Sequence, residues 1–241
     1  MKRTRAEAVL ARLDALPYPA RMTGMARWAR SAGAAERDDV LAELGRGDLY
    51  RRGLALHAAV VARHTPAVVA LLGDPDPRLR ARALSPACEL APDAVAAVLA
   101  DAPVWLRRRW YRLMRRRGDH GLPDHMIDEV RGRYGDEEAA VLLTACSPAT
   151  VARLLPEVGH ALNRSALARR HPDLAVDDAE RTLAALPEGR RATWWEWYCD
   201  GLLAAAPARP HRVLDVLERY APADRLPGNL RRYGVLLAAD P

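Results

Sequence analysis

The sequence contains no phenylalanine, a single isoleucine (Ile127) and a single lysine (Lys2) among its 241 residues. Its apolar residues are mostly alanine and leucine, which favour helices over strands. No segment shows the sustained alternation of apolar and polar residues that is typical of a half-buried strand. Because half of the residues are hydrophobic, the chain can form a core. These features predict an all-α fold.

Three cysteines, Cys88, Cys146 and Cys199, lie far apart and form no C-x-x-C pair. This pattern argues against a disulfide framework or a zinc site, and is typical of buried thiols in a reducing compartment. No apolar segment follows the basic start of the chain, and no run of about 18 apolar residues occurs anywhere. We therefore expect a cytoplasmic protein with no membrane partner.

Motifs of common enzyme classes are also missing. The sequence has no G-x-G-x-x-G, no Walker loop, no G-x-S-x-G and no H-E-x-x-H. His125 and Glu129 are four residues apart and can share a metal on one helix face, but no further ligands are evident. We expect no metal, no cofactor and no small-molecule substrate.

Positive charge is concentrated in one segment. The formal net charge is +6, and Trp105–Arg117 alone holds seven arginines and no acidic residue. The rest of the chain has a formal net charge of +6 − 7 = −1, so the positive charge of the protein is mostly local to this segment. A GC-rich genome also favours arginine over lysine, which makes the arginine content by itself a weak indication of function.

One internal repeat is visible. The segment Leu72–Arg80 matches Leu99–Arg107 at an offset of 27 residues, and a weaker copy covers Asp48–Ala55. In each copy one helix ends, the chain turns through aspartate or proline, and a second helix begins with an apolar residue followed by arginine. Neither helix buries its apolar side alone, so neighbouring pairs must stack.

Apolar periodicity, with proline and glycine between segments, predicts more helices outside the repeats. They cover residues 3–16, 20–30, 36–44, 123–133, 137–145, 149–162, 174–186, 190–205 and 211–220. No linker rich in glycine or serine divides them, so we expect one continuous domain over residues 1–241.

The pattern at Asp74–Leu84 resembles a HEAT-like repeat, most clearly over residues 48–117. The whole chain is similar to uncharacterised HEAT-repeat proteins of GC-rich actinobacteria. The resemblance implies an α-solenoid of stacked antiparallel helix pairs and no particular activity. From Leu230 the sequence reads as a helix that begins another pair. Three interpretations are open: the chain is the N-terminal part of a longer array, its end packs on a partner, or its last helix folds back on the last pair.

The arginine-rich segment forms an amphipathic helix at about 100° per residue, with Leu106, Trp110 and Met114 on its apolar side. The candidate surface consists of arginines and two aromatic residues at its edges: Trp105, Arg107, Arg108, Arg109, Tyr111, Arg112, Arg115 and Arg116. Arginine binds phosphate bidentately and stacks on bases, so nucleic acid is one possible partner. The other interpretation is a solvated face paired with neighbouring acids. Arginines at the repeat position either line a groove or cap carbonyl groups.

An aromatic and acidic cluster near the C-terminus resembles the site of the alkylpurine DNA glycosylases, a HEAT-like family. Trp194, Trp195 and Asp200 correspond to the tryptophan pair and aspartate that these enzymes use against a damaged nucleotide. The aspartate follows the second tryptophan by five positions where four are expected, and the cluster lies late in the chain. Alternatively, Trp194, Trp197 and Tyr198 share one helix face and belong to the core.

We favour a non-catalytic interaction scaffold that binds a protein partner through its solenoid surface. Binding of nucleic acid through the arginine-rich helix is the alternative, and a glycosylase-like enzyme is the third hypothesis.

Overall fold

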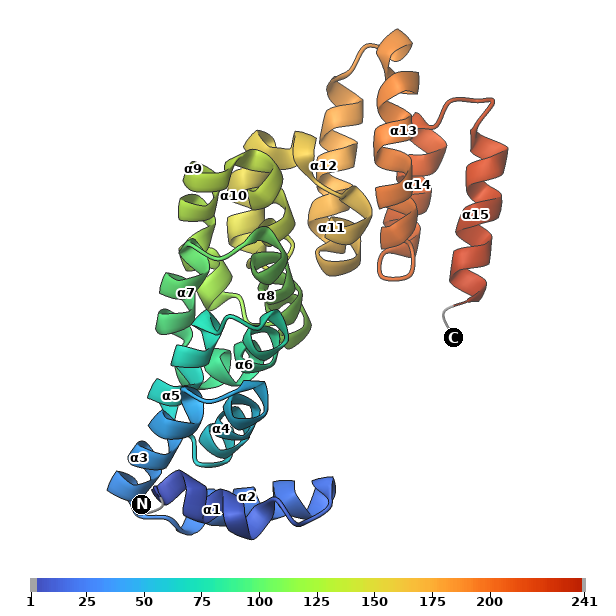
Figure 1. Ribbon diagram of the computed structural model, residues 1–241. Helices are drawn as coiled ribbons and strands as arrows, with labels where there is room; N and C mark the ends of the chain where they lie inside the picture. The colour runs from blue at the N-terminus through green and yellow to red at the C-terminus, as the bar shows by residue number, and fades with distance from the viewer. Residues whose placement is uncertain (1–3, 240–241) are drawn as a thin grey trace. The chain divides into compact units, whose positions relative to one another are not determined.

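The computed structural model describes residues 4–239, and every regular element in this range is a helix (Figure 1). The predicted all-α fold is therefore confirmed. None of the described helices is long and apolar enough to cross a membrane. Contacts divide the chain into two compact units, Met1–Leu113 (unit 1) and Met114–Pro241 (unit 2), with the boundary inside helix α8 (Val104–Arg117). The assignment of residues 1–241 to one domain stays a prediction.

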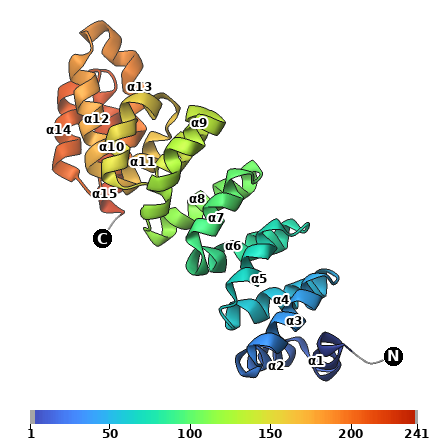
Figure 2. The same cartoon turned by 90° about the vertical axis from the view of Figure 1, so that its left-hand side faces the viewer.

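Unit 1 is built from short helices that pack on their near neighbours along the chain. Besides the first part of α8, its helices are α1 (Arg5–Leu13), α2 (Tyr18–Ser31), α3 (Ala34–Gly45), α4 (Leu49–Val61), α5 (Thr65–Ala70), the 3₁₀ turn η1 (Leu71–Gly73), α6 (Pro77–Leu90) and α7 (Pro92–Ala100). Helix α2 packs on α4 and α4 on α6, while α1 packs on α3 and α3 on α5. Figure 2 shows these helices following one another in chain order. Such near-neighbour packing is typical of helical repeats.

Unit 2 has the same kind of packing. Besides the end of α8, its helices are α9 (Gly121–Leu143), α10 (Pro148–Val158), the 3₁₀ turn η2 (Gly159–Ala161), α11 (Arg164–Arg170), α12 (Pro172–Ala185), α13 (Glu188–Ala205), α14 (Pro210–Tyr220) and α15 (Leu226–Ala238). Helix α11 packs on α12 and α13, α12 on α14, and α13 on α15. In Figure 1, helices α12 to α15 run side by side.

The predicted helices are present, with boundaries that differ by a few residues. The two helices predicted at 123–133 and 137–145 form one element, α9, with a break at Gly135. Gly135 has φ +83° and ψ 179°, a conformation that only glycine adopts without strain. Across the break, Arg131 Nε donates to Asp136 Oδ1 at 2.8 Å. Helix α11, seven residues long, was not predicted.

The turn before α6 confirms the local chemistry expected of the repeat. Asp76 is the N-cap of α6, and its carboxylate accepts hydrogen bonds from the backbone N–H groups of Arg78 and Leu79, at 2.7 and 3.3 Å. Pro77 occupies the first helical position, where no N–H group is needed. In the same way, Asp48 caps α4.

Arginines in the first turns of helices tie each helix to the turn before it, in a contact that we call the arginine clamp. An arginine is the fourth residue of six helices and the first residue of α11. In each case its guanidinium donates to a backbone carbonyl five or six residues earlier, at 2.6–3.3 Å. The clamps are Arg21–Leu16, Arg37–Ala32, Arg52–Gly47, Arg80–Asp74, Arg107–Ala102, Arg164–Gly159 and Arg191–Leu186. Carbonyls at helix ends and turns lack the intrahelical N–H partner, and such donors satisfy them. The Gly159 carbonyl differs in that it also accepts from the backbone N–H of Leu162 at 3.3 Å. The repeat-position arginines Arg80 and Arg107 therefore cap carbonyl groups.

One clamp also bonds to a carboxylate of the next turn. Arg52 Nε donates to Asp74 Oδ2 at 2.8 Å, and the Asp74 side chain is only 2% exposed. Asp74 Oδ1 accepts from the backbone N–H of Asp76 at 2.7 Å, which orders the turn before α6. Arg52 and Asp74 thereby join the first turn of α4 to the turn before α6.

None of the three cysteines forms a disulfide, and all three are buried, as the sequence indicates. Burial is the largest cause that raises the pKa of Cys146, and it raises the pKa of Cys199 to about 11. Both thiols therefore stay protonated at neutral pH and lack the thiolate that redox or nucleophilic chemistry requires.

Candidate binding pocket

Unit 2 contains an open pocket of about 790 Å³. Its lining comes from the end of α10, the turn η2, the first residue of α11 and the facing sides of α12 and α13. This volume lies within the range of about 300–1,000 Å³ that is usual for ligand pockets.

The floor of the pocket is a buried carboxylate. Asp178 is 6% exposed and accepts hydrogen bonds from the guanidinium of Arg164, from Arg181 Nη2 at 2.9 Å and from the Tyr198 hydroxyl at 3.2 Å. A buried carboxylate is tolerated only when cations and hydrogen bonds replace its water, and these three donors do so. Both of its oxygens therefore already accept at least one hydrogen bond.

Arg164 connects this floor to the arginine clamps. Its Nη2 atom donates to the carbonyl of Gly159 at 3.3 Å, and its guanidinium lies 4.0 Å from the centre of the Tyr198 ring. The close approach of α13 to α11 depends on Gly201, because a Cβ atom there would lie 3.0 Å from the Cβ of Arg164. A small residue is therefore needed where α13 crosses α11.

Tyr198 completes the polar floor. Its hydroxyl lies 3.1 Å from the hydroxyl of Thr182 as well as near Asp178. Burial is the largest cause of the raised pKa of Tyr198. The phenol therefore stays protonated at neutral pH and acts as a hydrogen-bonding group.

Two tryptophans form an aromatic wall. Trp194 and Trp197 line the pocket and are 41% and 49% exposed. The ring of Trp194 stacks on that of Tyr198, with centroids 6.4 Å apart and an interplanar angle of 30°. The prediction that both tryptophans belong to the core was wrong, because the buried face of α13 runs through Trp195 and Tyr198 instead.

The residues of the glycosylase-like cluster lie in three different environments. Trp194 lines the pocket, whereas Trp195 is 1% exposed and lies in the core. The side chain of Asp200 is 69% exposed and forms an ion pair with Arg232 at 2.7 Å. Trp195 and Asp200, the other two members of the predicted set, therefore do not line the pocket.

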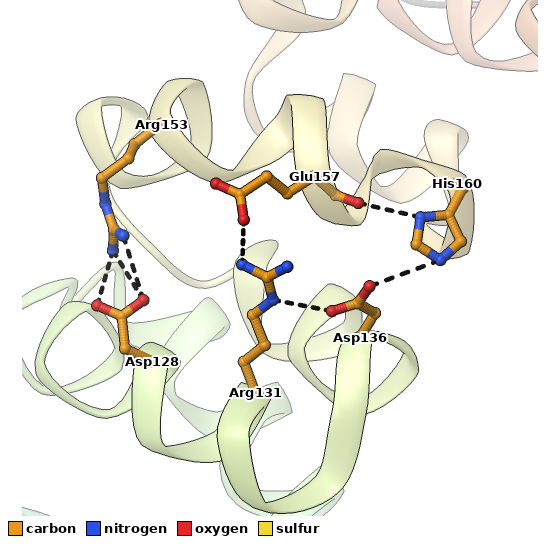
Figure 3. Close-up of polar contacts among 6 residues, drawn as sticks. All are labelled: Asp128, Arg131, Asp136, Arg153, Glu157 and His160. Carbon is orange, nitrogen blue, oxygen red and sulfur yellow. Dashed lines mark hydrogen bonds and ion pairs between the residues drawn. The ribbon is translucent and has the colours of Figure 1, made fainter.

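An ionic network at one rim of the pocket holds His160 (Figure 3). His160 Nε2 lies 3.7 Å from Asp136 Oδ2, and its Nδ1 lies 3.1 Å from the backbone carbonyl oxygen of Glu157. Arg131 bonds to both Asp136 and the Glu157 carboxylate, so one arginine of α9 connects the break in α9 with the end of α10. The network thereby fixes the position of η2, which carries His160 into the pocket lining.

Two of the residues predicted to lie on the surface of the arginine-rich helix α8, Arg107 and Tyr111, are buried. Arg107 is 8% exposed because it forms a clamp to Ala102, and Tyr111 is 2% exposed beside Trp110. Trp105 is 38% exposed, and the guanidinium of Arg80 lies 5.3 Å from the centre of its ring.

The other arginines of α8 are at least partly exposed. Arg115 is partly buried and donates to the Thr144 hydroxyl at 3.2 Å, while Arg108, Arg109, Arg112 and Arg116 are exposed. Of these four, Arg109, Arg112 and Arg116 form no hydrogen bond or ion pair within residues 4–239. Their spacing of three and four residues places them on one side of the helix.

Within the described part of the chain, no group of three or more His, Cys, Asp or Glu residues lies close enough to hold a metal ion. The His125–Glu129 pair therefore has no third protein ligand of these types in that range.

Sequence reasoning missed the polar floor. Asp177 and Asp178 are adjacent acids in α12, and nothing in the sequence distinguishes the exposed one from the buried one. Helix α11, which begins with Arg164, is too short to produce a periodic signal. Its N-cap residue Asn163 is the sequence signal that could have indicated the start of this helix. Comparisons with protein-family models, with curated proteins and with solved structures find no match for this chain.

We expect Asp178→Asn to lower the free energy of unfolding by about 3 kcal/mol, because the guanidinium groups of Arg164 and Arg181 lose the buried carboxylate that compensates their charge. The matched control is Asp177→Asn, whose side chain is 53% exposed and pairs with Arg212 at 2.7 Å. This control should cost less than about 1 kcal/mol. Urea unfolding followed by circular dichroism measures both. Equal losses in the two variants would contradict the assigned floor.

Proposed function

We propose that this chain is an α-solenoid of HEAT-like helix pairs and acts as a non-catalytic scaffold that binds a partner protein in the pocket of unit 2. The near-neighbour packing of its helices and the repeated arginine clamps support the solenoid. In such arrays the stacked pairs offer extended surfaces to partners.

The observation that carries the proposal is the aromatic wall. Trp194 and Trp197 expose large apolar rings next to each other, inside a pocket. Tryptophans of this kind are enriched among the residues that dominate protein–protein binding energy, because their rings bury a large area with few rotamers to fix. Exposed apolar surface that gathers in a concavity marks a binding site.

The chemistry of the floor supports binding over catalysis. Asp178 already accepts hydrogen bonds from three donors, and the raised pKa of Tyr198 keeps its phenol protonated at neutral pH, so both act as hydrogen-bonding groups. Both groups provide a fixed polar surface beneath the tryptophans.

Charge supports a protein partner for this pocket over nucleic acid. Residues 114–241 contain 18 arginines against 19 aspartates and glutamates, a formal charge of −1. Several of these arginines are paired with acids of α12, as in Arg209–Asp173 and Arg219–Glu180. Affinity for nucleic acid needs several unpaired cations along a track of phosphates, and unit 2 has no net positive charge to supply it.

We expect the double variant Trp194→Ala with Trp197→Ala to lose a partner that the wild-type chain captures. Tagged proteins are recovered from the source cells and compared by quantitative mass spectrometry. The control is Tyr18→Ala with Leu49→Ala, two exposed apolar residues of unit 1. At least one protein should be recovered in equal amounts with the wild type and the control, and its recovered amount should be at least about tenfold lower with the pocket variant. Identical recovery with all three chains contradicts the proposal.

A second function, nucleic-acid binding, is favoured by one observation in unit 1. Residues 1–113 contain 19 lysines and arginines against 12 acids, a formal charge of +7. Arg109 and Arg112 are exposed, lie on one side of α8 and have no ion-pair partner within the described residues. Such arginines can bond to phosphate groups.

If this second function holds, Arg109→Gln with Arg112→Gln should lower the slope of log affinity against log salt concentration by about two, since two phosphate contacts are lost. Fluorescence anisotropy with duplex DNA, single-stranded DNA and RNA at about 50 and 200 mM salt measures the slope. Arg27→Gln with Arg30→Gln, exposed arginines with the same spacing on α2, is the control. Binding that is absent, insensitive to salt or unaffected by the α8 variant excludes this function for α8.

A further inference from the structure

We infer that the pocket of unit 2 recognises an aromatic side chain that is followed or preceded by a carboxylate, in an exposed acidic segment of the partner protein. The inference rests on the proposed function and specifies the chemistry of the occupant. It is drawn from the aromatic wall, the charges of the lining and the exposure of Arg181.

The apolar part of the occupant is set by Trp194 and Trp197. Both belong to α13, three residues apart, and both line the cavity of about 790 Å³. An aromatic ring inserted here would meet indole faces and edges, which favour offset or edge-to-face contact with another ring. The volume accommodates such a ring together with its neighbouring residues.

The charge of the occupant is set by the floor. The lining contains two guanidinium groups, Arg164 and Arg181, against the single carboxylate of Asp178. These three lining groups together carry a formal charge of +1. A lysine or arginine side chain of a partner would meet this charge unfavourably, whereas a carboxylate would be attracted.

Arg181 is the group that can receive the carboxylate. Arg164 is only 11% exposed and is occupied by Asp178, Gly159 and the Tyr198 ring. The side chain of Arg181 is 65% exposed and donates to Asp178 through Nη2. Its guanidinium carries five N–H donors in all, so donors beyond the one bonded to Asp178 remain for a partner's carboxylate.

The test uses three blocked tetrapeptides, Gly-Asp-Phe-Gly, Gly-Asn-Phe-Gly and Gly-Lys-Phe-Gly, which differ only in charge beside the ring. They are titrated into the full chain, with the indole N–H signals of its tryptophans observed by NMR and assigned by single Trp→Phe exchanges. The Asp peptide should bind about threefold more tightly than the Asn peptide and the Lys peptide most weakly, with shifts at Trp194 and Trp197.

Two variants separate the role of Arg181 from the general charge of the protein. Arg181→Gln should remove the preference, so that the Asp and Asn peptides bind with equal affinity. Arg212→Gln, an exposed arginine of α14 outside the lining, should keep the preference. Melting curves of both variants establish that they are folded.

Equal binding of the Asp and Asn peptides to wild type, tighter binding of the Lys peptide, or no shift at the two tryptophans would overturn the inference. Tighter binding of a thymidine dinucleotide than of any peptide would also overturn it, in favour of a nucleotide. If the peptides bind without a preference for the Asp peptide but still shift the signals of Trp194 and Trp197, the inference fails and the proposed binding of a partner protein still stands. Failure of the proposed function is recognised separately, by partner capture that does not depend on Trp194 and Trp197.

Discussion

The arginine clamp is the interaction on which the rest of the structure depends. Each helix pair must turn within a few residues, and the turn leaves backbone carbonyls without an N–H partner. An arginine near the start of the next helix reaches back to one of these carbonyls, in both units of the chain. Because the arginine has further donors, it can bond to a carboxylate as well, and this second bond fixes the direction of the next helix.

In unit 2 this second bond creates the pocket floor. Arg164 clamps the carbonyl of Gly159 and also holds Asp178, so α11, α12 and the turn η2 are joined at one buried point. Tyr198 of α13 packs under the guanidinium and donates to the same carboxylate. With the core side of α13 committed to these contacts, Trp194 and Trp197 are left on the open side. The exposed aromatic surface of the pocket is thus a consequence of how the turn is closed.

Much of the fold could be predicted because its causes are local. The offset of 27 residues between Leu72–Arg80 and Leu99–Arg107 reflects a capped turn that the structure shows in detail at Asp76 and Pro77. The break at Gly135 falls between the two helices that the sequence predicts over residues 123–133 and 137–145. These features depend on nearest neighbours in sequence, which is where propensity and capping act.

The site could not be predicted to the same degree because its causes are tertiary. The arginine run of α8 reads as one charged face, yet the clamp to Ala102 buries Arg107. In α13, two sets of residues satisfy helical spacing equally well, and packing on α11 and α12 decides that Trp195 is buried and Trp197 is not. The position of Asp178 depends on Arg164, 14 residues earlier, whose helix is too short to recognise from periodicity.

The most direct test of this account is the free energy of unfolding of Arg164→Lys, measured beside Arg181→Lys. Both changes keep the charge opposite Asp178, but lysine cannot hold the carbonyl, the carboxylate and the tyrosine ring together. We predict a loss of about 2–3 kcal/mol for Arg164→Lys, which lies at the buried clamp, and less than about 1 kcal/mol for Arg181→Lys, which is largely exposed. Small and equal losses would show that charge alone is needed and would contradict the clamp as the constraint that shapes the pocket.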